Sequence, residues 1–331
     1  MGTRALRSIR LGLETTAGTA VAATTYWRGS GTLEDQREII FPEEDISFLM
    51  RSDRSYAAKL GAAINLDAIP ATFEQLPYLL TSGIKALTTG AADSTGSGKV
   101  YAYTIPTSTA NSISTFTIEG GDDTAQEEME YAFCESFTLE GNAGEALMMS
   151  ANMIGRQVST SAWTTTATLP TVEEIMVSSA TFAIDTAGGT AGTTLVSSTL
   201  KGINLSVTTG WKPQWTADGA LYFGTVAVGI PEITLEATML YNASAVSEVA
   251  AWRAQTARLI QLKFAGTALT TAGNYTTKTL KVVLVGKWAK FGKIDEDDGV
   301  DVISGTFNAR YNSTAAQAGA FTVVNNLTSL P

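Results

Sequence analysis

The chain has 331 residues and a mass of 34.8 kDa, a length that predicts two compact domains. Its 22 basic and 32 acidic residues give a net charge of −10, which excludes the basic surface by which nucleic-acid binders hold phosphates. Histidine is absent and Cys134 is the single cysteine, which excludes His-based catalytic dyads, a disulfide framework and cysteine-rich metal sites. We therefore expect a protein that is not an enzyme, with no catalytic residue, metal or cofactor.

The N-terminal segment MGTRALRSIRLGLETT is basic but lacks the apolar core of an export signal. No later run approaches the roughly 20 apolar residues that span a membrane. We expect a soluble protein made in a cytoplasm, with no membrane partner.

In chain order, the first half predicts a strand in YAAKLGAAINL, a helix in residues 71–87, a strand in STFTIEGG and a hairpin over residues 130–156. Thr72 and Gln75 predict a capping box for the helix. Pro77 predicts that the helix is short or broken, and Gly83 that it stops there. In the hairpin, Phe137 and Leu139 share the apolar face with Leu147, Met149 and Ala151. The polar face carries Ser136, Thr138, Glu140, Ser150 and Asn152.

The second half repeats this order, with strands in EITLEATML and RLIQLKFAG on either side of a helix in residues 242–259. Ser244 is the predicted cap. The apolar helix stripe is Val246, Val249, Ala250, Ala254 and Ala257.

A second hairpin over residues 279–311 turns at Asp298-Gly299, which we favour over a calcium loop in the acidic run IDEDDGVDV because the ligand register is wrong. On its returning strand, Ile303, Phe307 and Tyr311 alternate with a polar set: Ser304, Thr306, Asn308 and Arg310.

The shared order of elements predicts a duplicated module, although the two halves have little sequence identity. The Thr-rich segment SAWTTTATLPTVEE suggests a boundary, giving domains 1–165 and 166–331. Each helix would then cap the core of one β module.

Four segments together resemble the tail tube (major tail) proteins of long-tailed bacteriophages. They are LGLETTAGTAVAAT, ATFEQLPYLL, GWKPQWTADGALYF and NARYNSTAAQAGAFTVVNNLTSLP, and they spread over most of the chain. The resemblance implies tandem β-sandwich or barrel modules, each with a flanking helix, whose hairpins join those of neighbouring copies into a closed inner barrel. Rings of six modules would stack into a tube through which phage DNA is ejected.

The resemblance also implies the partners and location. The chain would bind itself as a trimer with pseudo-six-fold symmetry, or alternatively as a hexamer, and other tail proteins at the tube ends. It would lie in the virion tail after assembly in the host cytoplasm. DNA would pass without specific binding through a polar, electronegative bore, which unpaired inward-facing Lys281 and Lys287 would contradict.

Residues 29–55 are charged and also rich in apolar side chains. In the family a long loop near the start reaches the next ring, so the resemblance places the ring-stacking contact at Ile39, Ile40, Phe41, Phe48 and Leu49. An ordinary hairpin on the first sheet is an equal alternative.

Two other classes of protein remain open from the sequence. One is a different β-rich assembly, such as a virion decoration or surface-layer protein. The other is an enzyme that uses carboxylates alone, for which Glu232 and Glu236 would be the candidates.

Overall fold

The computed structural model describes residues 2–330 and has a mainly β fold with short helices, as the alternating pattern predicts. The elements of the first half are η1 (Arg4–Leu6), β1 (Ser8–Leu13), β2 (Thr25–Tyr26), β3 (Gly31–Asp35), β4 (Glu38–Ile40), β5 (Tyr56–Lys59), β6 (Ala62–Pro70), α1 (Leu76–Gly83), β7 (Ala91–Ala92), β8 (Lys99–Thr104), β9 (Phe116–Gly121), β10 (Gln126–Asn142), β11 (Met148–Gly155) and β12 (Val158–Thr160).

The second half follows after a long extended segment. Its elements are η2 (Val177–Ser179), β13 (Ala180–Thr186), β14 (Leu200–Thr208), β15 (Trp211–Gln214), β16 (Thr225–Val228), β17 (Glu232–Leu240), α2 (Ala243–Arg253), β18 (Arg258–Ala268), β19 (Thr277–Phe291), β20 (Asp295–Asp297), β21 (Val300–Ala309) and β22 (Gly319–Asn325).

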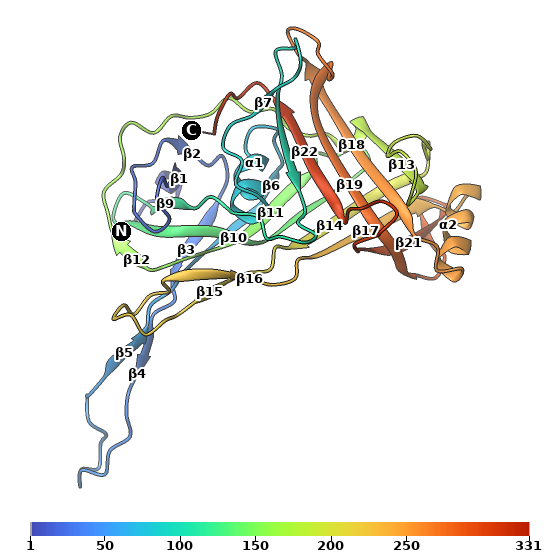
Figure 1. The fold of residues 1–331 in the computed structure, drawn as a ribbon. Coiled ribbons are helices and arrows are strands. Elements are labelled where there is room, and N and C mark those ends of the chain that lie inside the picture. The colour runs from blue at the N-terminus through green and yellow to red at the C-terminus, as the bar shows by residue number, and fades with distance from the viewer. Residues whose placement is uncertain (1, 331) are drawn as a thin grey trace.

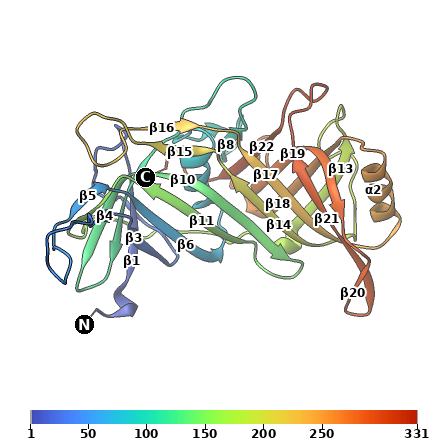
Figure 2. The same ribbon diagram turned by 90° about the horizontal axis from the view of Figure 1, so that it is seen from below.

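One antiparallel sheet runs through both halves. Its order is β3, β6, β11, the second part of β10, β14, β17, β21 and the last residues of β19. Figure 2 shows the middle strands of this sheet side by side along the length of the molecule. The junction between the halves is the β10–β14 pair, in which Thr138 lies opposite Ser206 and Leu139 opposite Leu205.

A second layer packs over this sheet (Figure 1). In the first half it contains β2, β1, β9, the start of β10 and β12. In the second half it contains β13, β18, the start of β19 and β22, followed by β8 from the first half. Strands β10 and β19 bend and belong to both layers, and each has a bulge at the bend, near Glu135 and Ala289 respectively.

The apolar faces of the two layers enclose one hydrophobic core. Phe137, Leu139 and Met149 of the first hairpin are buried, as predicted, and pack in the same cluster as Leu235 and Phe307. Each residue alternates with a polar neighbour that points away from this core, because successive side chains of a strand lie on opposite faces.

Six strand pairings of the first half recur in the second half. In the first half β1 pairs with β9, β3 with β6, β6 with β11, and β10 with β9, β11 and β12. In the second half β13, β14, β17, β18, β19, β21 and β22 repeat these pairings in the same order. The division at residues 165 and 166 stays a prediction, and β8 crosses it by pairing with β22.

The first predicted helix is present and short, but Pro77 does not break it. The Gln75 backbone N–H donates to Thr72 Oγ1 at 3.1 Å, which is half of the expected capping box. Pro77 lies in the first turn, where its missing N–H costs no helical hydrogen bond. Gly83 is the last helical residue.

The second helix differs from the prediction in its cap and its buried stripe. Asn242 is the N-cap, and its Oδ1 accepts from the N–H groups of Ser244 and Ala245 at 3.0 and 3.1 Å, so Ser244 is not the cap. The buried residues are Ala245, Glu248 and Ala251, whereas Val246 of the predicted stripe is exposed.

Glu248 explains the shift of the buried stripe. Its Oε2 accepts from Trp288 Nε1 at 2.8 Å and from Arg258 Nε at 3.0 Å, so a charged side chain faces the core with its partners. A hydrophobic pattern cannot anticipate such a satisfied carboxylate.

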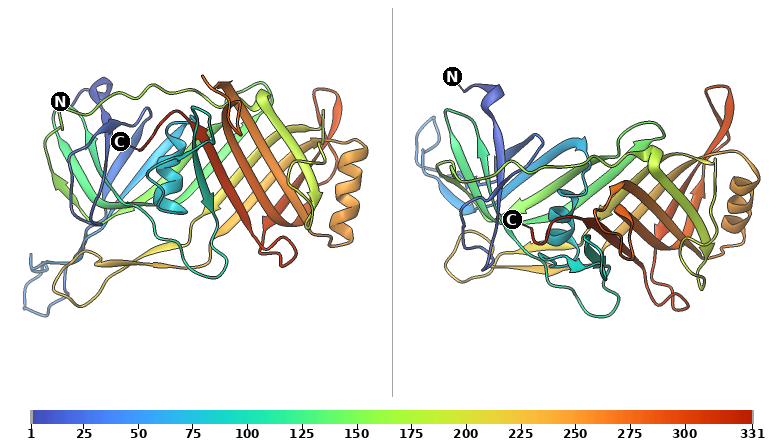
Figure 3. Two further views of the ribbon diagram at one scale, coloured as in Figure 1. Left: turned by 45° about the horizontal axis from the view of Figure 1, so that its top comes forward. Right: turned by 90° about the horizontal axis from the view of Figure 1, so that it is seen from above.

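The two helices also differ in their surroundings (Figure 3). Helix α1 lies in the middle of the molecule and α2 at its far end. All eight residues of α1 are buried, whereas most of α2 is accessible. No described helix is long and apolar enough to cross a membrane.

Candidate functional site

The predicted polar residues of the two hairpins lie on one continuous face of the long sheet. The registers place Thr138 opposite both Ser150 and Ser206, and Ser206 opposite Thr234, which lies opposite Asn308. Directly opposed residues of antiparallel strands point to the same side. All eight candidates therefore share this face, namely Ser136, Thr138, Glu140, Ser150, Asn152, Ser304, Thr306 and Asn308.

Side-chain hydrogen bonds run across the strands of this polar face. Asn204 Nδ2 donates to Glu140 Oε2 at 3.3 Å, and Thr306 Oγ1 donates to Glu236 Oε1 at 3.3 Å. The hydroxyl groups of Thr238 and Ser304 are 2.9 Å apart. The face is thus a polar surface whose side chains are joined by hydrogen bonds across the strands, and Glu140 and Glu236 line one hollow in it.

The middle of the face consists of residues that were not among the predicted candidates. Asn204, Ser206 and Thr208 come from β14, and they line the surface between the two hairpins. Alternation in GINLSVT was the available signal, because Asn204 and Ser206 alternate with buried Leu205 and Val207.

The charge of the face is acidic in the middle and basic at one edge. Glu140, Glu232 and Glu236 lie on the central strands. Lys287 lies opposite Asn308 on the edge strand, exposed and without an ion pair among residues 2–330. This finding counts against a uniformly electronegative face. Lys281 belongs to the other layer, opposite Lys263.

Both edges of the long sheet are open in the described chain. At one end β3 pairs with β6 alone. At the other, the last residues of β19 pair with β21 alone, and the free side of Ala289 accepts a hydrogen bond from Trp252 Nε1 at 3.1 Å. An unpaired row of N–H and C=O groups is a template for pairing with another chain.

Residues 36–61 form an arm that leaves the sheet next to β3. Strands β4 and β5 pair only with each other, and Figure 1 shows them projecting away from the body. The arm therefore continues the β3–β6 pair of the first sheet into a hairpin that leaves the sheet. Its apolar side chains are exposed at Ile39, Phe41, Phe48, Leu49 and Met50, whereas Ile40 is half-buried.

The tip of the second hairpin agrees with the predicted turn, with one exception further along. Asp298 and Gly299 both have positive φ, 53° and 77°, as a two-residue hairpin turn requires. Ile303 and Phe307 are buried as predicted, but Tyr311 lies beyond the end of β21 and is 58% exposed. Among residues 2–330 no group of three or more acidic or Cys side chains is placed to hold a metal.

A scan against models of known protein families found no match, and a search of curated proteins found no similar sequence.

Proposed function

We propose that the chain is a structural virion protein that associates with itself into rings, and that the rings stack into the hollow tail tube through which phage DNA is ejected. The observation that carries this proposal is the long sheet with one polar face, one buried face and two open edges. When copies join edge to edge and close a ring, both edges are paired, and none is left for uncontrolled aggregation.

The polar face is the proposed lining of the tube. Hydroxyl, amide and carboxylate side chains hold water and carry few positive charges, so a polyanion meets nothing that binds it strongly. The repeated pairings of the two halves favour three chains per six-module ring, with six chains as the alternative.

Negative-stain electron microscopy of the purified protein, with mass photometry to count chains per particle, tests the proposal. We expect rings or hollow tubes and a three-chain particle. A monomer that persists at high concentration would refute the proposal and favour a decoration protein, and flat arrays would favour a surface-layer protein.

The stacking contact has its own test. Exposed apolar side chains at the arm tip contribute binding energy only if another surface covers them. Phe48→Ser with Leu49→Ser should leave folded rings that no longer form tubes. Tubes formed as readily as by the original chain would show that the tip does not stack rings.

A further inference from the structure

The junction between the two halves shows which contacts hold one module to the next. Beyond the β10–β14 pair, the Thr209 N–H donates to the Glu135 carbonyl at 2.9 Å. The β15–β16 hairpin then lies across the end of the first half, where Trp211 Nε1 donates to the carbonyl of Gly83, the last residue of α1, at 3.0 Å. Trp211 is only 8% exposed.

A second contact fixes the far strand of this hairpin. Phe223 packs edge-on against Tyr131 and Phe133, with ring centroids 5.1 and 6.2 Å apart. Arg156 donates to the carbonyls of Phe223 and Gly224 at 3.0 and 3.3 Å. The hairpin is therefore held by Trp211 at the start of β15, by Phe223 in the loop before β16, and by hydrogen bonds from Arg156.

The repeated pairings identify the arm as the equivalent of this hairpin. Strand β3 pairs with β6 as β14 pairs with β17, and each first strand leads directly into a two-stranded hairpin. Ile39 lies opposite Ala57 in the arm, and Trp211 lies opposite Val228 in the β15–β16 hairpin. The arm therefore stands where the anchoring hairpin of the first module begins. Its base touches the β15–β16 loop, where Trp215 Nε1 donates to the Leu60 carbonyl at 3.3 Å, but among residues 2–330 strands β4 and β5 pair only with each other.

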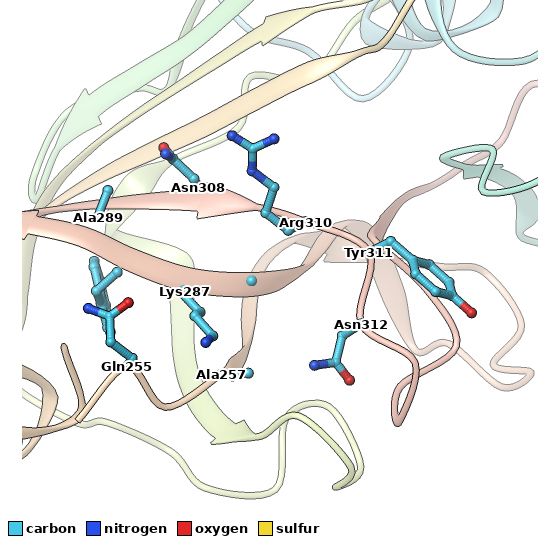
Figure 4. A pocket seen from close by; sticks show the side chains of 10 residues that line it. Gln255, Ala257, Lys287, Ala289, Asn308, Arg310, Tyr311 and Asn312 are labelled. Carbon is cyan, nitrogen blue, oxygen red and sulfur yellow. The ribbon is translucent and has the colours of Figure 1, made fainter. Parts of the chain in front are cut away.

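The same alignment identifies the surface of the second half that corresponds to the one on which the β15–β16 hairpin lies in the first half. The bulges of β10 and β19 match Glu135 with Ala289, and the paired strands then match Arg156 with Arg310. A groove on the second half is lined by Ala289 and Arg310 together with Lys287, Asn308 and Gln255, which follows the end of α2. Figure 4 shows Lys287 and Asn312 extending towards the loop of Gln255 and Ala257.

Side chains of the groove, the open edge and the arm are exposed or lack partners, whereas their equivalents at the junction between the halves are covered or bonded. Arg310 is exposed and its guanidinium has no hydrogen bond or ion pair among residues 2–330, whereas Arg156 clamps two carbonyls. Leu33 is half-buried, but its equivalent Leu205 is 1% exposed, because β10 covers it. Ile39, the equivalent of Trp211, is 52% exposed.

Charge also fits a second copy of this chain at this position. Matching the β10–β14 register onto the open edges puts Gly292, the residue after β19, opposite Glu34 of the next copy, and puts Lys290 opposite Gln36. Lys290 then lies diagonally beside Glu34, within reach of a long side chain. Both groups lack an ion pair among the described residues, so Lys290 and Glu34 each gain a partner.

We propose that the β4–β5 arm of one copy lies in the α2–β19–β21 groove of the next copy in the same ring, as the β15–β16 hairpin lies on the first half of its own chain. Ile39 takes the place of Trp211, and Arg310 donates to arm carbonyls. The arm loop, residues 41–55, is longer than the loop of residues 215–224. It therefore leaves Phe48 and Leu49 beyond the groove, free to contact a neighbouring ring. This inference rests on the self-association proposed above.

Two designed disulfides test the register. Glu34→Cys with Gly292→Cys should link one copy to the next under mild oxidation, giving covalent multimers on a denaturing gel. A Cβ at Gly292 meets only an ordinary contact, 3.6 Å from the Ser304 carbonyl oxygen. Thr138→Cys with Ser206→Cys is the matched control, because this equivalent pair should close within one chain. Glu34→Cys with Lys287→Cys is out of register and should link poorly.

Arg310→Ala tests the arm seat. It should lower the fraction of chains in rings by about tenfold at a fixed concentration near the assembly threshold, with an unchanged Tm of the single chain. Arg253→Ala, an exposed arginine on α2, is the control and should assemble normally.

The outcomes separate this inference from the proposed function. Rings that form without the Glu34–Gly292 link, and equally well with Arg310→Ala, would overturn the arm placement and leave self-association intact. If the original chain never associates, both proposals fail.

Discussion

Lys278 holds a buried charge cluster between the two halves, and its removal gives a sharp test of how they are joined. Its Nζ lies 2.6 Å from Glu74 Oε1 and 3.0 Å from Glu173 Oε2. The side chains of Lys278, Glu74 and Glu173 are 14, 5 and 21% exposed. Glu74 precedes α1, Glu173 lies in the connecting segment and Lys278 begins β19, so one ammonium group joins three distant parts of the chain.

Lys278→Met should destabilise the protein by about 3 kcal/mol. Removing one partner of a buried ion pair costs about 3–5 kcal/mol because the other charge stays buried, and the partial exposure of Glu173 places the value at the lower end. An unfolding entropy of about 2.1 cal/mol/K per residue gives about 0.7 kcal/mol/K for this chain, so Tm should fall by about 4 °C. Differential scanning calorimetry at pH 7 measures this shift.

The matched control is an exposed ion pair. Arg51 lies 2.8 Å from Glu43, and the two side chains are 78 and 76% exposed. Arg51→Met should change stability by less than about 0.5 kcal/mol. A Lys278→Met variant within about 1 kcal/mol of the original chain would refute the reasoning that these charges are both buried and mutually required.

The same cluster predicts a pH dependence. Burial alone would raise the pKa of Glu173, but hydrogen bonds from Thr267 and the contact with Lys278 outweigh it and hold that pKa below its usual value. A carboxylate with a lowered folded-state pKa contributes stability above its unfolded pKa of about 4.3, and this contribution is lost as the pH falls through the folded value. The stability difference between the original chain and Lys278→Met should therefore shrink below about pH 4. A difference that stays constant down to pH 3 would contradict this assignment.

Three further experiments each probe a single residue. Asn242→Ala should cost about 1 kcal/mol, because it removes both bonds of the α2 cap, whereas Ser244→Ala should have little effect; equal Tm values would contradict the cap assignment. Burial raises the pKa of the Cys134 thiol, so Ellman's reagent should react with it only after urea unfolding, and rapid labelling of the folded chain would be inconsistent with its position. Glu14→Gln should cost about 2 kcal/mol by urea unfolding, because the N–H groups of Gly18 and Tyr131 donate to different oxygens of Glu14 and an amide puts an NH2 donor in place of one of them; an unchanged midpoint would show that the amide is accommodated.

The sequence predicted the local elements well because alternation is a local property. The faces of the two hairpins, the Asp298-Gly299 turn and the order of strands around each helix follow from residues close together in the chain. The predictions were wrong where a residue distant in the sequence determines which side chain is buried. Glu248 replaces Val246 on the buried side of α2 because Trp288 and Arg258 receive its carboxylate.

The joint between modules could not be predicted from the sequence for a related reason. Nothing in the alternation of β14 states that β10 is its neighbour, since any strand with a matching apolar face could lie there. Likewise, the aliphatic side chain of Ile39 and the indole of Trp211 give no sign in the sequence that the two positions are equivalent.

Only the matched pairings reveal that Ile39 and Trp211 open equivalent hairpins. Their different exposure follows from what lies against them: Trp211 rests on the first half of the chain, whereas no part of residues 2–330 covers Ile39 in the same way. The same reasoning applies at the other end, where α2 is accessible and its equivalent α1 is covered. The chain therefore has one internal junction between its halves and two exposed surfaces, each of which matches one side of that junction. Repeated association of identical copies requires two complementary surfaces of this kind.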